Sequence, residues 1–129
     1  MSKKILIVED SPQNMRLIKM ALSAESYTLL EATDGEEALE VAEKERPDLI
    51  LMDIQLPKMS GLEVTRKLRE IPEFSRTPII AITAYAMMGD EEKALDAGCN
   101  AYLTKPIRVR ELPDLITIML LQRQEEGEG

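Results

Sequence analysis

Leu49-Ile50-Leu51-Met52-Asp53-Ile54-Gln55-Leu56-Pro57 is the stretch that decides the fold. Four apolar residues run directly into one aspartate, Asp53, and Pro57 ends the extended segment. A continuous apolar run of this length predicts a strand buried on both faces, as in a parallel sheet covered by helices. Asp53 then lies at the carboxyl end of a central strand, the edge of an open α/β sheet where ligands bind. The alternative is that Asp53 only caps the strand and faces solvent.

The rest of the chain alternates short apolar runs with stretches of helical periodicity. Ser11 and Pro12 mark the first helix, since a capping hydroxyl followed by proline is a typical helix start. The same signals predict strands over residues 5–8, 28–32, 49–53, 78–82 and 101–103, and further helices over 36–45, 61–70, 87–97 and 109–121. This alternation fits right-handed βαβ units. We therefore predict one α/β domain over residues 1–123, a doubly wound five-stranded parallel sheet in the flavodoxin-like order 2-1-3-4-5, followed by a frayed acidic tail over 124–129.

The composition narrows the classes of function. The net charge of -8 argues against binding nucleic acid through the chain's own surface, because such binding depends on Lys and Arg. The absence of histidine excludes histidine triads, histidine metal sites and phosphohistidine within this chain. The single cysteine excludes an internal disulfide. The start does not resemble a signal peptide, and no apolar run approaches the ~20 residues that cross a bilayer, so we predict a cytoplasmic protein without a membrane segment.

Polar side chains follow four of the five predicted strands. Glu9 and Asp10 follow the first strand and Asp53 ends the third, while Thr83 follows the fourth and Lys105 the fifth. In the order 2-1-3-4-5 these four strands are neighbours, and their carboxyl ends converge on one crevice beside the topological switch point. The sequence therefore predicts one site built from three carboxylates, one hydroxyl and one ammonium group.

These groups suit phosphoryl transfer to a carboxylate. Asp53 would be the nucleophile and would form an acyl phosphate. Lys105 would neutralise charge on the phosphoryl oxygens, and Thr83 would hydrogen-bond one of them. Taken singly, each of these residues has an ordinary structural explanation, such as a strand end or a surface charge. Their coincidence at one sheet edge favours the functional interpretation.

The clustered acids also predict a metal site. Three anions that lie close together repel each other, and a hard cation relieves the repulsion. Mg²⁺ suits a few carboxylates together with retained waters and a substrate phosphate. We predict that Asp10 and Asp53 bind Mg²⁺ directly, that Glu9 acts through water, and that Gln55 offers its backbone carbonyl.

With these residues in place, the sequence resembles the receiver domains of two-component response regulators. The matching motifs are Val8-Glu9-Asp10, Leu51-Met52-Asp53-Ile54-Gln55-Leu56-Pro57, Ser60-Gly61, Ile82-Thr83-Ala84, Ala97-Gly98 and Lys105-Pro106, in the family's order and spacing. The resemblance covers essentially the whole chain up to the acidic tail. The segment Thr83-Ala84-Tyr85-Ala86-Met87 is most similar to stand-alone regulators of cell division, although receivers fused to hybrid histidine kinases look much the same.

The resemblance implies a mechanism and partners. Asp53 would accept a phosphoryl group from the phosphohistidine of a histidine kinase or histidine phosphotransferase. Thr83 and Tyr102 would be a switch pair, and the Lys105-Pro106 bond would be cis. The signal would pass to a downstream protein effector, either from a stand-alone regulator or from a receiver that acts as a phosphorelay intermediate. A small aspartyl-phosphate phosphatase is the less favoured alternative, because Gln55 stands where such enzymes carry a second aspartate.

The last predicted helix has a broad apolar surface. One stripe would pack on the sheet, and it consists of Val109, Leu112, Ile116 and Met119. The apolar surface is extended to the side of this stripe by Leu115, Ile118 and Leu121. This width predicts a partner or dimer surface, although part of it can be core. We expect a monomer or a weak dimer.

Overall fold

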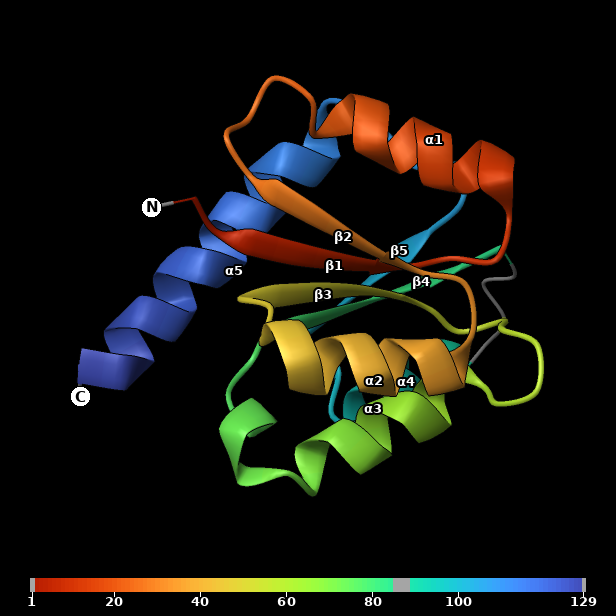
Figure 1. The fold of residues 1–129 in the computed structure, drawn as a ribbon, viewed down its shortest axis with the longest axis vertical. Helices are drawn as coiled ribbons and strands as arrows, with labels where there is room; N and C mark the ends of the chain where they lie inside the picture. Colours follow the sequence, from red (N-terminus) through yellow and green to blue (C-terminus); the bar gives the residue numbers. More distant parts are fainter. Residues whose placement is uncertain (1, 85–88, 129) are drawn as a thin grey trace.

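The computed structural model describes residues 2–84 and 89–128, with side chains described as far as Arg123. Within these residues, five parallel strands form one sheet in the order β2-β1-β3-β4-β5, as predicted (Figure 1). The strands are β1 Lys4–Val8, β2 Thr28–Ala32, β3 Leu49–Asp53, β4 Ile79–Thr83 and β5 Ala101–Thr104.

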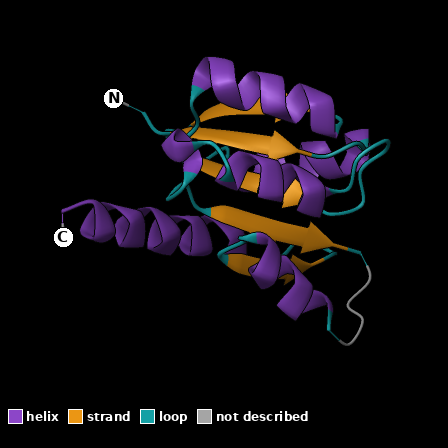
Figure 2. Cartoon of the chain, turned by 90° about the horizontal axis from the view of Figure 1, so that it is seen from below, coloured by secondary structure: helices purple, strands orange, loops and turns teal. Residues whose placement is uncertain are grey.

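Helices cover both faces of the sheet (Figures 1 and 2). They are α1 Pro12–Ala21, α2 Gly35–Glu45, α3 Gly61–Arg69, α4 Asp90–Ala97 and α5 Glu111–Glu128, with a short 3-10 turn, η1 Pro72–Phe74, that was not predicted. The apolar side chains of α1 and α5 pack on one face, and those of α2, α3 and α4 pack on the other. None of the described helices is long and apolar enough to span a membrane.

The central strand β3 explains why the opening stretch decides the fold. All five of its residues are buried. Leu49 and Leu51 belong to the core beneath α1 and α5, and Ile50 and Met52 to the core beneath α2, α3 and α4. A strand buried on both faces needs apolar side chains in both directions, and the run from Leu49 to Met52 supplies them before the strand ends at Asp53.

Local signals place the helix starts. Ser11, Asp34 and Ser60 each accept a hydrogen bond from a backbone N–H three residues further along the chain, which caps α1, α2 and α3. Gly61 starts α3 beside the end of β3, where a Cβ atom would collide with the Asp53 backbone carbonyl. Glycine therefore lets α3 begin against the strand that ends in Asp53.

The helix boundaries differ from the predictions mainly in the last third of the chain. Helix α5 starts at Glu111 rather than Val109, and it continues beyond the predicted end at Leu121 to Glu128. Gln, Arg and Glu residues after Leu121 are good helix formers, so the helix continues into the predicted tail. The described part of the fourth helix begins at Asp90; the predicted start at Met87 and the neighbouring Tyr85 lie outside the described residues.

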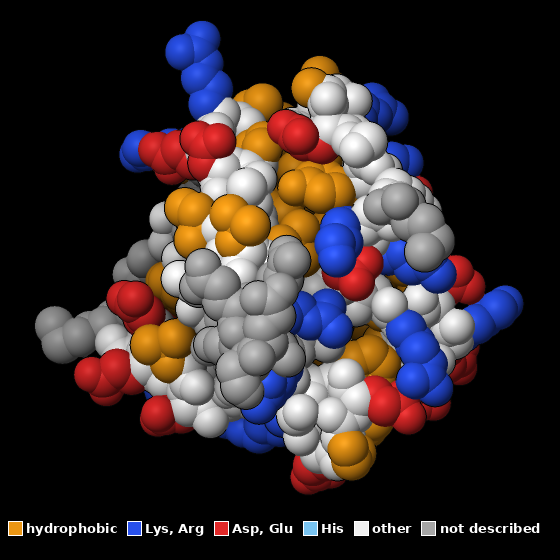
Figure 3. Space-filling view, turned by 90° about the vertical axis from the view of Figure 1, so that its left-hand side faces the viewer, with side chains coloured by type: hydrophobic (Ala, Val, Ile, Leu, Met, Phe, Trp, Pro, Cys, Tyr) orange, Lys and Arg blue, Asp and Glu red, His pale blue; other side chains and the backbone are white. Residues whose placement is uncertain are grey.

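Charges of both signs share the surface. On the face shown in Figure 3, Lys and Arg side chains are interspersed with Asp and Glu, and hydrophobic side chains lie exposed between them. The described side chains of this face therefore do not form the continuous basic patch that is typical of nucleic-acid binding.

Candidate functional site

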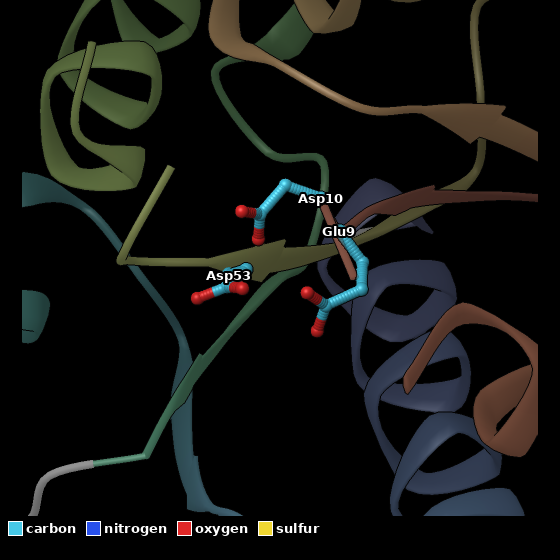
Figure 4. A group of neighbouring side chains, drawn as sticks. All are labelled: Glu9, Asp10 and Asp53. Atoms are coloured by element: carbon cyan, nitrogen blue, oxygen red, sulfur yellow. The ribbon is translucent and has the colours of Figure 1, made fainter. Parts of the chain in front are cut away.

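The carboxyl ends of the strands bring three acids together. Glu9 and Asp10 follow β1, and Asp53 is the last residue of β3. One carboxylate oxygen from each lies within 4.8 Å of the others, and the three side chains converge in Figure 4. The juxtaposition that the strand order predicts is therefore present.

The Asp53 carboxylate is held from two sides. Its side chain is only 1% exposed. Oδ1 accepts a hydrogen bond of 2.8 Å from the Gln55 backbone N–H, and Oδ2 lies 3.1 Å from the Lys105 ammonium. These two contacts fix the orientation of the carboxylate at the end of a buried strand. The interpretation of Asp53 as a solvent-facing strand cap does not fit this burial.

Lys105 links the acids to strand β4. Its Nζ lies 2.9 Å from Glu9 Oε1 and 3.1 Å from Asp53 Oδ2, and its side chain is 15% exposed. Its backbone N–H donates a 2.7 Å hydrogen bond to the Thr83 carbonyl, and the Lys105-Pro106 peptide bond is cis, as predicted. Burial alone would lower the pKa of the ammonium, but contacts with Glu9 and Asp53 outweigh burial and raise its pKa.

The carboxyl group of Glu9 is buried, and its surroundings raise its pKa. It is 1% exposed, and its Oε2 accepts a 3.1 Å hydrogen bond from the Ser11 backbone N–H. Burial, followed by the contact with Asp53, raises the pKa of Glu9 to about 7, although Lys105 and Ser11 act in the opposite direction. Its Oε1 lies close to Lys105 but accepts no hydrogen bond of good geometry from the described residues.

The site fits a hard divalent cation. Three carboxylates face one ammonium group, so negative charge exceeds positive charge locally. The buried Glu9 Oε1 accepts no hydrogen bond of good geometry from the described residues, and Asp10 is exposed, which leaves room for waters on the cation. Oxygen ligands with retained water are what Mg²⁺ prefers. The predicted use of the Gln55 backbone carbonyl as a ligand stays a prediction.

Thr83 and Tyr102 lie on the same face of the sheet. Thr83 ends β4 and is buried, and the strand register places Tyr102 opposite Ala81, diagonally across from Thr83. The Tyr102 hydroxyl is buried without a hydrogen-bond partner among the described residues. Its burial, followed by the charges of Asp90 and Glu91, raises the pKa of Tyr102. The role of these two residues as a switch pair stays a prediction.

One contact at the site was not predicted from the sequence. The Gln55 side-chain Oε1 accepts a hydrogen bond of 3.3 Å from the Ala84 backbone N–H. The contact follows from the strand register: Asp53 pairs with Ile82, so Gln55 lies beside Ala84. The sequence analysis assigned the backbone carbonyl of Gln55 to the metal site but did not predict this side-chain contact.

Known proteins are similar to this chain in sequence and in fold. Residues 5–117 match the family model of the response regulator receiver domain. The polar-differentiation response regulator DivK of Brucella anthropi is 50% identical over 109 residues, which cover 84% of this chain and 89% of DivK. The same figures hold for DivK of Brucella ovis.

Two crystal structures illustrate the likeness. A CheY-like receiver domain protein of Methanospirillum hungatei has a TM-score of 0.91 and 33% identity, over 98% of this chain and 100% of its own. The receiver domain of a sensor histidine kinase of Pseudomonas aeruginosa, with magnesium in its active-site cleft, has a TM-score of 0.85 and 40% identity, over 93% and 98%. This chain belongs to the family of response regulator receiver domains.

Proposed function

We propose that this chain is a phosphoacceptor, in which Asp53 receives a phosphoryl group from the phosphohistidine of a histidine kinase or histidine phosphotransferase. The observation that carries the proposal is the arrangement around Asp53. A buried carboxylate is oriented by the Gln55 N–H and by Lys105, beside a pair of acids that suit a metal ion. A strand cap would need none of these groups.

The transfer follows from the roles of the side chains. An Asp53 carboxylate oxygen attacks phosphorus, the new O–P bond forms as the P–N bond of the donor breaks, and the bonding electron pair leaves with the imidazole. Lys105 offsets charge on the phosphoryl oxygens, and the Thr83 hydroxyl donates to one of them. Glu9, Asp10 and Asp53 would hold Mg²⁺, which supplies positive charge that screens the incoming phosphoryl group from the carboxylates.

Labelling with acetyl phosphate tests the proposal. Intact mass spectrometry in the presence of Mg²⁺ should show one added phosphoryl group on the wild-type chain and none on Asp53→Asn. Asp48→Asn is the matched control, since Asp48 precedes the same strand at its opposite end. It should be labelled like the wild type. Equal labelling of Asp53→Asn and the wild type would overturn the assignment of the nucleophile.

The output would be contact with a protein effector rather than catalysis on an external substrate. The 50% identity to DivK favours a regulator that acts alone. The 40% identity to the receiver domain of a sensor histidine kinase favours a second possibility, a phosphorelay intermediate. A relay intermediate should pass its label from Asp53 to a histidine phosphotransferase in a mixture of the two proteins. A terminal regulator should instead lose the label to water.

Cys99 is buried and forms no disulfide, which supports the proposed cytoplasmic location. The exposed apolar residues of α5, Ile118 and Leu121, form part of the predicted partner surface. Both assignments stand as part of the proposal.

A further inference from the structure

The outer edge of strand β2 is open. β2 stands first in the sheet order, and among the described residues only β1 pairs with it (Figure 1). The backbone of Thr28 faces β1, since its N–H donates to the Lys3 carbonyl. Backbone groups alternate in direction along a strand, so those of Leu29 and Glu31 point away from the sheet. These two residues therefore offer N–H and C=O groups to a further strand.

An apolar groove of about 720 Å³ lies beside this edge, between α1 and β2. It is lined by Met15 and Leu22 on the side of α1, and by Tyr27 and Leu29 on the side of β2. Met20 lies at the same groove and is 63% exposed. A free strand edge beside an apolar groove is the arrangement used in β-strand addition. There the added backbone bonds to the edge, and alternate side chains enter the pocket.

The surroundings of this edge are predominantly acidic. The charged residues that line the groove are four acids and two cations: Glu9, Asp10, Glu25, Glu31, Arg16 and Lys19. Of these, Lys19 is already paired with Glu31 at 2.9 Å. On the other face of the sheet, α2 packs against β2, and its exposed charged side chains are Glu36, Glu37, Glu40, Glu43 and Lys44. Acids on both faces of the edge favour a partner rich in Lys and Arg.

The same charges disfavour a second copy of this chain on the edge. Each copy carries a net charge of -8 and would bring Glu31 and the α2 glutamates toward their counterparts. Like charges placed across paired strands are destabilising. The charge of the edge therefore selects a different chain, with basic side chains, as its occupant.

We infer that the outer edge of β2 and the groove beside it form a docking site for an extended, basic segment of a partner protein. Apolar residues alternate with Lys or Arg in this segment. Alternate side chains of an added strand fall on opposite faces of the sheet. The apolar ones enter the groove over Leu29, and the basic ones lie on the face that carries α2. The inference does not depend on phosphorylation of Asp53.

A short synthetic peptide in which valine alternates with lysine is the probe for this site. Amide hydrogen exchange should slow about tenfold at Leu29 and Glu31 when the free peptide is at ten times its Kd. The Leu30 N–H faces β1 and is the internal control, so its exchange should not change. A second peptide of the same composition, with the valines and the lysines in separate blocks, should not protect the two outward amides.

Exposed variants separate docking from a general attraction of charge. Isothermal titration calorimetry with the alternating peptide should show about fivefold weaker binding to Glu31→Lys, because an attraction at the edge is lost. Met20→Gln keeps the length of the side chain but removes apolar surface, and should weaken binding about threefold. Glu70→Lys makes the same change of charge at the exposed end of α3 and should bind as the wild type does.

Three outcomes would overturn the docking site. They are the absence of protection by the alternating peptide, equal protection by the two peptides, and equal weakening by Glu31→Lys and Glu70→Lys. Protection of Leu29 and Glu31 that grows with protein concentration, without any peptide, would show a second copy on the edge. That result would overturn the basic partner.

Discussion

An aspartate stands at each end of strand β3, and the two have very different surroundings. Asp48, before the strand, accepts a 2.8 Å hydrogen bond from the Lys4 backbone N–H and lies 3.6 Å from the Arg123 guanidinium. It is one carboxylate beside one cationic group, and its side chain is 30% exposed. Asp53, after the strand, is 1% exposed and shares a single ammonium group with Glu9 while Asp10 lies nearby.

The balance of charge around each aspartate distinguishes a structural carboxylate from a candidate functional one. At Asp48 each charge is balanced, and the contacts join β1, β3 and α5. At Asp53 negative charge is in excess, and a protein does not gather buried carboxylates for stability alone, since each loses hydration and repels the others. Such an excess of negative charge suits the binding of a cation.

Loss of Lys105 should have the largest effect on stability. Lys105→Met leaves the buried carboxylates of Glu9 and Asp53 without their shared cation, and breaking such a contact costs about 3 kcal/mol. Urea denaturation without Mg²⁺ should show this loss.

The loss should also depend on pH. Burial raises the pKa of Glu9 in the folded state from 4.5 to about 7. The folded state therefore binds the carboxyl proton of Glu9 more tightly than the unfolded state does. The stabilisation that results is lost as pH rises through that range. Without the ammonium, the pKa of folded Glu9 should rise further. The stability that Lys105→Met loses relative to the wild type should therefore be larger above pH 7 than below it. A loss of less than about 1 kcal/mol at every pH would show that removing the cation beside Asp53 costs no more stability than removing the cation beside Asp48.

The comparison also shows what the sequence alone could predict. Glu9, Asp53, Thr83 and Lys105 follow apolar runs, and in a parallel sheet all such positions fall on one edge, so their convergence could be predicted. The sheet order 2-1-3-4-5, which was predicted as that of a doubly wound, flavodoxin-like sheet, is confirmed.

Contacts that depend on exact register or on distant partners could not be predicted. Gln55 meets Ala84 only because Asp53 pairs with Ile82 rather than with a neighbour. The continuation of α5 is accompanied by a bond from Arg123 to the Asp48 carbonyl, a residue 75 positions earlier in the chain. Nothing in the local sequence near Leu121 indicates that partner.

Addition of Mg²⁺ should stabilise the protein through the carboxyl end of β3. At ten times its Kd, a ligand that binds only the folded state adds about 1.4 kcal/mol, which corresponds to a few degrees in Tm. Asp10→Asn should remove most of this gain because it takes away a carboxylate of the cluster, and Asp48→Asn should keep it. Differential scanning calorimetry with and without Mg²⁺ measures both. An equal gain in Asp10→Asn and the wild type would place the cation elsewhere.

Removal of the charge at the other end of the strand should cost least. The Arg123 guanidinium donates a 2.8 Å hydrogen bond to the Asp48 carbonyl, but its ion pair with the carboxylate is long and about one-third exposed. Exposed ion pairs contribute little, so Arg123→Met should lose about 1 kcal/mol, mostly from the hydrogen bond. The loss should be local: amide hydrogen exchange should accelerate in the last turns of α5, while labelling of Asp53 and the Mg²⁺ response stay as in the wild type. A changed Mg²⁺ response in Arg123→Met would mean that the two ends of β3 are coupled, and the division between a structural and a functional aspartate would fail.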